Sequence, residues 1–323
     1  MKYIIPLLLL LVLASCSSKP GLKPRIKLST GDAYTVKLDV EMKNRTKVMI
    51  VNAGSEKQRF ILNTEWKVER IEDDSIYVIA ATIQSFKLQL NEKPEVNIGI
   101  PDTLKNRFPR IALDTIADKM KGAVYQFKLS HHGEIIETTG ADSAIYKAFV
   151  QAYGTEVPDS VYRFDFAELK SYCGNSSLSD YTKQLFSAFP SASEWREGDD
   201  YYNEIELNKF VESANQDIQF YCRNEWTCKG RDKNGDVVLN AKGRFSDRSS
   251  DERNQAQVGF SLKIEGAQEA GVSFDSLMFM PQRAEIRQQY KMSLGVTNII
   301  FNMNFGSTNV NRTIVYQLTP VKK

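Results

Sequence analysis

The sequence predicts a mainly β protein with two long-stranded antiparallel curved sheets, or half-barrels, separated by a central helical segment. Apolar and polar residues alternate with a period of two on both sides of the middle of the chain, which is typical of strands that bury one face. Between them, the apolar residues recur at three- and four-residue intervals, which indicates helices. We expect an N-terminal sheet over residues 25–141, helices over 142–192 and a C-terminal sheet over 193–323.

The first fifteen residues have the organisation of a secretory signal peptide. Lys2 precedes an apolar run from Ile4 to Leu13, which is too short for a membrane-spanning helix of about 20 residues. Leu13-Ala14-Ser15-Cys16 matches the lipobox of bacterial lipoproteins, in which the Cys thiol is acylated and the chain is cleaved before it. We therefore expect residues 1–15 to be removed and Cys16 to carry palmitate-like acyl chains; an ordinary signal cleaved nearby is the alternative.

Residues 16–24 are rich in Ser, Pro, Gly and Lys and lack apolar periodicity, so we expect a flexible tether. Each buried lipid methylene contributes about 0.8 kcal/mol, so several acyl chains hold a protein firmly to a membrane. By resemblance to known sorting rules, Ser17 in place of an aspartate argues against retention in the inner membrane. The expected location is the outer membrane, with the domain facing the periplasm.

Regular alternation over 34–42 and 60–68 predicts two long strands of the N-terminal sheet. The apolar residues change parity within 77–90, so a bulge near Gln84-Ser85 is needed to keep one face inward. We expect a turn at residues 131–133, where two histidines precede a glycine.

Three helices are expected in the middle of the chain. Asp142 or Ser143 can cap the first, Asp159 can begin the second, and Pro190 stops the third. Alternating strands then resume, and Asn234-Gly235 predicts a tight hairpin turn between two of them.

The chain resembles a family of bacterial lipoproteins known only as a domain of unknown function. The resemblance runs from about residue 25 to 320 and assigns no catalytic residues. A Trp typical of the family is replaced by Asp200-Tyr201-Tyr202. At fold level, the expected sheets are similar to lipoprotein-carrier half-barrels, which hold acyl chains on a concave apolar face. The motifs that carry the resemblance are Gly31-Asp32-x-Tyr34, Gly133-Glu134-Ile135, Gly140-Ala141-Asp142, Phe189-Pro190, Glu197-Gly198-Asp199 and Gly271 with Asp275.

Three cysteines follow Cys16. In an oxidising compartment one disulfide is expected, most simply between Cys222 and Cys228 with Cys173 left over, and the other two pairings stay open. Cys173 acting as a nucleophile with His131 or His132 is the functional alternative, but no triad pattern surrounds it.

A recurring tripeptide predicts covalent modification. Asp followed by Ser or Thr and an aliphatic or Ala residue resembles the acceptor motif of a general bacterial O-glycosylation system. The alternative is helix-cap and turn chemistry, which favours the same residue types. The expected acceptors are Ser75, Thr103, Thr115, Ser143, Ser160 and Ser276.

Charge and motif content argue against several functional classes. Lys and Arg number 42 against 40 Asp and Glu, so no basic excess points to nucleic acid. The only histidines, His131-His132, are expected in a turn rather than at a metal, and Asp232-Lys233-Asn234-Gly235-Asp236 lacks the residues that complete a calcium loop. No phosphate-binding Gly-rich loop or nucleophile elbow occurs, so we expect no cofactor.

The sequence therefore predicts a non-enzymatic protein, attached to the membrane by its lipid anchor, that binds a hydrophobic ligand or an envelope partner. A structural or assembly lipoprotein is the alternative, and a hydrolase is the third possibility. Aromatic and Met side chains can either line a lipid cleft or fill the core, and those singled out are Trp66, Phe86, Phe260, Met278, Phe279 and Met280.

Overall fold

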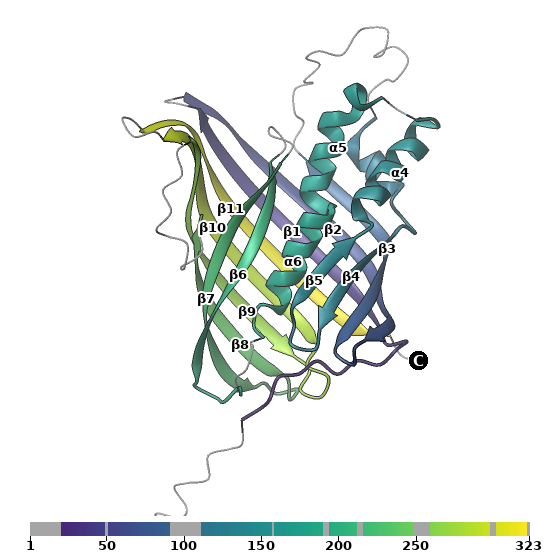
Figure 1. Cartoon of the computed structure of the whole chain (residues 1–323), viewed down its shortest axis with the longest axis vertical. Coiled ribbons are helices and arrows are strands. Elements are labelled where there is room, and N and C mark those ends of the chain that lie inside the picture. Colours follow the sequence, from purple (N-terminus) through teal and green to yellow (C-terminus); the bar gives the residue numbers. More distant parts are fainter. Residues whose placement is uncertain are drawn as a thin grey trace, which may run out of the picture.

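Eleven antiparallel strands form one curved sheet, in the order β5-β4-β3-β2-β1-β11-β10-β9-β8-β7-β6 (Figure 1). The prediction of a mainly β fold with a central helical segment is confirmed. The computed structural model describes residues 21–48, 51–90, 111–156, 158–189, 194–211, 216–247, 259–297 and 302–321.

Along the sequence, the strands of one half of the sheet precede α4–α6 and the strands of the other half follow them. The N-terminal half consists of β1 (Ala33–Val48), β2 (Val51–Glu72), β3 (Ile76–Leu90), β4 (Val124–Ser130) and β5 (Ile135–Thr139). The C-terminal half consists of β6 (Asp200–Val211), β7 (Gln216–Arg231), β8 (Val237–Ser246), β9 (Gly259–Phe274), β10 (Pro281–Thr297) and β11 (Asn302–Pro320). The described helices are α3 (Leu113–Asp118), α4 (Ala141–Tyr153), α5 (Asp159–Cys173) and α6 (Asn175–Phe186).

The two sheets expected from the sequence are joined into one. β1 pairs with β11 from Tyr34 opposite Pro320 to Val48 opposite Gly306. Alternation along a strand specifies the face that it buries but not the strand with which it pairs. The junction between the first and last strands is therefore visible only in the structure.

Helix α6 covers both free edges of the sheet. It contacts β5 and β6, and Figure 1 shows it between these two strands. The Oδ2 of Asp180 accepts a hydrogen bond from the backbone N–H of Asn208 at 2.7 Å, and the Nζ of Lys183 donates to the carbonyl of Glu206 at 3.2 Å. Unpaired groups on an edge strand invite pairing with another chain, so these contacts protect the edge formed by β6.

Inward residues of the strands pack against the helices and form the main core. The predicted bulge is confirmed, because Asn63 pairs with Ser85 and Thr64 with Ile83, which leaves Gln84 as the extra residue. The aromatic and Met residues expected either to line a cleft or to fill the core are core residues where their side chains are described: Trp66, Phe86, Phe279 and Met280 are buried, Met278 packs beside them, and the side chain of Phe260 lies outside the described residues.

Asp142 does not cap the first predicted helix. Gly140 precedes α4, and the carboxylate of Asp142 accepts a hydrogen bond from the backbone N–H of Asn175 at 2.8 Å and pairs with Lys170 at 3.0 Å. It therefore links α4 to α5 and α6.

The predicted start of the second helix at Asp159 is confirmed, whereas the short helix α3 lies inside the region expected to be sheet.

The predicted tether extends too far. Leu22 exchanges two backbone hydrogen bonds with Trp195, at 2.8 and 2.7 Å, and Ile26 and Leu28 are buried. The fold therefore includes residues 21–24.

Cys16 and the predicted signal over 1–15 lie outside the described residues and stay predictions. Within the described ranges, no helix combines the length and apolar character required to cross a bilayer.

The predicted disulfide between Cys222 and Cys228 is wrong. Both residues belong to β7, and the three described cysteines are unbonded and buried. Six residues of strand separate two Cα atoms by about 20 Å, whereas a disulfide requires roughly 4.4–6.8 Å. Sequence proximity is misleading here because an extended strand holds its residues apart.

We expect the three buried thiols to be unreactive in the folded protein. Burial raises the pKa of Cys222 to about 12, so the nucleophilic thiolate is scarce at mildly alkaline pH. A chromogenic thiol reagent should label the Cys16→Ala variant only after unfolding in urea. Adding Lys47→Cys, an exposed position near the end of β1, provides a rapidly labelled control. Rapid labelling without that added cysteine would contradict the structure.

Candidate binding site in the C-terminal half of the sheet

A row of polar side chains crosses the concave face of the C-terminal half. Strand pairing places Asn224 opposite Gly243, Gly243 opposite Gln268, Gln268 opposite Gln288, and Gln288 opposite Arg312. The three amide side chains are at most 1% exposed, and Arg312 is half-buried. We call Asn224, Gln268, Gln288 and Arg312 the polar row.

Hydrogen bonds connect the polar row from β11 to β7. The Nε of Arg312 donates to the Oε1 of Gln288 at 2.6 Å. The Nε2 of Gln288 donates to the Oε1 of Gln268 at 2.6 Å and to the Oε1 of Gln184 on α6 at 2.7 Å. The Nε2 of Gln268 then donates to the Oδ1 of Asn224 at 2.9 Å. The network therefore connects α6 to the opposite wall of the sheet.

Gly243 makes room for the last of these hydrogen bonds. A Cβ atom at this position would overlap the Oδ1 of Asn224 and lie 3.1 Å from the Sγ of Cys222. Because glycine has no side chain, Gln268 can reach across β8 to Asn224. The residue between the two amides is thus required by the network rather than by backbone conformation.

The polar row leaves two buried donors without partners. The Nε2 of Gln184 and the Nδ2 of Asn224 have no hydrogen-bond partner among the described residues, and both side chains are 0% exposed. A buried donor without a partner costs about 1–3 kcal/mol. Such groups in native proteins are usually satisfied by water or a ligand, so the row offers donors to an acceptor.

Arg312 supplies a positive charge to this region. Its Cζ lies 5.5 Å from the centre of the Tyr181 ring, within cation–π range. Burial opposes the guanidinium charge, but Tyr290, Tyr181 and Asp180 outweigh it, so the pKa of Arg312 lies above its usual value. Burial also raises the pKa of Tyr181 to about 12. Arg312 is therefore cationic and Tyr181 neutral at physiological pH.

A second apolar cluster lies beyond the polar row, toward the β1–β2 turn. Gly266 of β9 allows the rings of Phe245 and Tyr290 to approach across this strand, with centroids 5.2 Å apart. We call this group the upper apolar cluster, and its described members all come from strands: Leu207, Phe220, Cys222, Phe245, Ile264, Tyr290 and Val310. The partly buried Met42, Ile205 and Met292 continue it.

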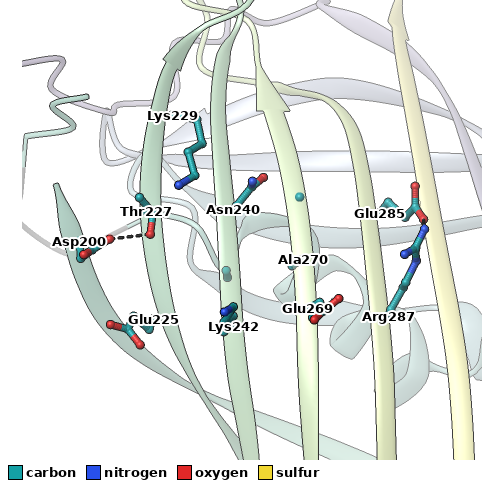
Figure 2. Close-up of a pocket in the computed structure, with 12 residues that line it drawn as sticks. Asp200, Glu225, Thr227, Lys229, Asn240, Lys242, Glu269, Ala270, Glu285 and Arg287 are labelled. Atoms are coloured by element: carbon teal, nitrogen blue, oxygen red, sulfur yellow. Dashed lines mark hydrogen bonds and ion pairs between the residues drawn. The ribbon is translucent and has the colours of Figure 1, made fainter. Parts of the chain in front are cut away.

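A shallow trough occupies the outer face of the same strands, and Figure 2 shows residues that line one part of it. It contains two adjoining hollows of about 580 and 680 Å³, both lined by Glu225, Lys242 and Glu269. Glu225, Lys242, Glu269 and Arg287 are consecutive cross-strand partners of alternating charge. Each such opposite-charge pair contributes about 0.2–1 kcal/mol, and the trough can recognise a polar partner that carries both charges.

The cysteine and histidine candidates do not form a reactive site. Cys173 is buried in the core with its Sγ 3.9 Å from the Sδ of Met120, and burial raises the pKa of its thiol, so it cannot serve as a nucleophile. His131 and His132 lie in the predicted turn, with their Nε2 atoms 2.8 Å apart rather than on opposite faces. No three His, Cys, Asp or Glu residues in the described part of the chain are arranged to hold a metal.

Glycosylation stays a prediction. The structure places Ser75 and Ser276 in turns and Thr115 and Ser143 near the starts of α3 and α4, and Thr103 and the side chain of Ser160 lie outside the described residues. Thr115 and Ser143 are exposed and therefore accessible.

The sequence-based predictions do not include the polar row, although polar residues at inward strand positions indicate it. Gln288 stands between Ile286 and Tyr290 at an inward position of an alternating strand, where an apolar residue is expected. Gln268 interrupts the inward face of β9 in the same way. A polar residue that breaks an apolar face is therefore the local sign of such a row.

A family model matches residues 74–277, more than half of the 323 residues. It describes a family of unknown function, DUF6263. The chain belongs to this family. The matched part of this DUF6263 chain includes Asn224, Gly243 and Gln268, but not Gln288 and Arg312. The expectation of a family of unknown function is confirmed.

Structural comparison finds similarity to lipovitellin, in a structure that concerns lipid–protein interactions. The identity is 10% and the TM-score 0.42, over 92% of this chain and 26% of lipovitellin, so the chain spans about a quarter of that protein. OpdQ from Pseudomonas aeruginosa aligns over 90% of this chain and 98% of its own, with 8% identity and a TM-score of 0.20. No curated protein matches this chain.

Gly243→Ala should destabilise the protein by about 1–3 kcal/mol, because the added methyl group displaces Asn224 and breaks its hydrogen bond with Gln268. Gly271→Ala is the matched control on the neighbouring strand, where a Cβ would meet only the Oδ1 of Asn240 at 3.4 Å. That variant should stay within about 0.5 kcal/mol of the parent protein. Urea unfolding measures both, and equal midpoints for the two variants would refute the role of Gly243.

Proposed function

We propose that this DUF6263 chain is a lipid-anchored protein of the bacterial cell envelope that binds an amphipathic ligand without catalysing a reaction. One observation carries the proposal: buried amide donors that have no partner among the described residues lie beside an apolar cluster whose described members all come from strands. An apolar ligand body suits the upper apolar cluster, and a polar head suits the polar row.

The chemistry of the polar row specifies the ligand head. The Nε2 of Gln184 and the Nδ2 of Asn224, which have no partner in the described part of the chain, are donors, and the guanidinium of Arg312 has donors only. The head must therefore provide acceptor oxygens, and the positive charge favours a carboxylate or phosphate. Fatty acids and phospholipids combine such a head with an apolar body.

The lipobox supports attachment to the membrane, and the sequence features after Cys16 favour the outer membrane facing the periplasm. The described fold begins at Gly21, five residues after Cys16. Five residues span at most about 18 Å, so the proposed anchor keeps the domain at the membrane surface. A membrane lipid is then the most accessible amphipathic ligand.

Gln288→Met should weaken ligand retention, because it keeps the side-chain length but removes the amide that joins Arg312, Gln268 and Gln184. Native mass spectrometry of the full chain released from membranes in mild detergent measures the bound lipid mass. Arg287→Met is the control, since it alters the adjacent residue on the outer face. Parent protein that is consistently empty, or equal loss in both variants, argues against the proposal.

Cys16→Ala should release the protein from membranes, because no acyl chain can then be attached. Fractionation with an alkaline wash measures this, and the parent protein is expected to stay in the membrane pellet. Continued sedimentation of the variant after the wash would exclude Cys16 as the anchor.

A structural or assembly role is the second candidate, and the outer trough favours it. Its alternating charges can dock a polar envelope protein on β7–β10. Under this alternative, Arg287→Met changes the envelope proteins that co-migrate with the chain, whereas Gln288→Met does not.

A further inference from the structure

Exposed apolar side chains gather at one end of the sheet. Seven large apolar residues are exposed in the described part of the chain. Five of them lie within three residues of the strand ends where β1 begins and β11 ends, the lower end in Figure 1: Ile71, Ile136, Tyr202, Leu277 and Val321. Leu277 is the most exposed, at 74%. Single exposed apolar residues are ordinary, but a ring of them around one end indicates a contact surface.

The N-terminal segment crosses the same end of the sheet (Figure 1). The backbone N–H of Ile26 donates to the carbonyl of His131 at 2.9 Å, and that of Lys27 donates to the carbonyl of Met278 at 3.1 Å. Leu22 pairs with Trp195. These bonds fix the point at which the chain reaches Gly21, so the five-residue connection to Cys16 starts from this end.

We propose that the lower end of the sheet is a membrane-contact surface that rests on the bilayer and places Leu277 in the lipid interface. The inference rests on the lipid anchor of the proposed function. With at most about 18 Å between Cys16 and Gly21, the anchored domain keeps this end near the membrane. The occupant of the apolar ring is therefore the lipid bilayer.

The β9–β10 turn is built to present Leu277 to lipid. The Oδ1 of Asp275 accepts hydrogen bonds from the backbone N–H groups of Leu277 at 2.8 Å and Met278 at 2.7 Å. The N–H of Phe279 donates to the carbonyl of Asp275 at 2.9 Å. Backbone donors that are already paired can leave water at lower cost, as contact with lipid requires. Met278 and Phe279 pack against the core, so the tip is held in place.

The surface is suited to lipid in general rather than to anionic lipid. Cations such as Lys23, with an 84% exposed side chain, occur at this end together with Asp73 and Asp74 in the β2–β3 turn. Since both charges are present, the apolar ring carries the contact, and vesicles of zwitterionic phosphatidylcholine are the appropriate probe.

Site-specific fluorescence tests the contact on the full lipidated chain. Leu277→Cys and, as the matched control at the opposite end, Lys47→Cys are labelled with a polarity-sensitive dye; the other described cysteines are buried. In phosphatidylcholine vesicles, nitroxide-labelled lipid should quench the dye at 277 several-fold more strongly than aqueous iodide does. The dye at 47 should show the reverse preference.

Flotation of the vesicles separates the failure of this inference from that of the anchor. If the labelled chain floats but iodide quenches both dyes equally, the membrane-contact surface is refuted and the anchor stands. If the parent chain does not float, both proposals fail. An O-glycan at Ser276 is incompatible with the contact, so peptide mapping that finds this residue glycosylated would also refute it.

Discussion

The rest of the structure depends on the pairing of the first strand with the last. Because β1 and β11 pair along their length, the chain forms one sheet whose free edges are β5 and β6. Helix α6 contacts both edges, which places its inner side chains against the opposite wall of the sheet. Gln184 then reaches Gln288 on β10. The covering of the edges and the assembly of the polar row are therefore consequences of the same strand pairing.

For the stability of the fold by itself, the polar row is less favourable than apolar residues would be. Apolar residues at these inward positions would extend the core, whereas buried amides must be hydrogen-bonded to offset their loss of hydration. The network pairs most of their atoms but leaves the Nε2 of Gln184 and the Nδ2 of Asn224 without partners among the described residues. It also requires glycine at 243. These costs are the physical reason to connect the row with ligand binding.

The two faces of the C-terminal half have different chemistry because adjacent strand residues point in opposite directions. Gln288 belongs to the inner amide network, while the neighbouring Arg287 belongs to the alternating charges outside. The same strands can therefore hold an amphipathic molecule on one face and a polar partner on the other. The exposed apolar residues at the lower end form a third surface, which combines a turn residue, Leu277, with residues at strand ends such as Ile71 and Tyr202.

Local sequence determined the features that depend on neighbouring residues. Alternation specified the buried face of each strand, the bulge at Gln84, and the turn at Asn234-Gly235, because side-chain direction and turn chemistry are properties of short segments. Only the tertiary structure decided that Asp142 joins three helices, and that Asn224 and Arg312 belong to one row. Strand register and helix docking bring these distant residues together, and neither is encoded in the periodicity of a single segment.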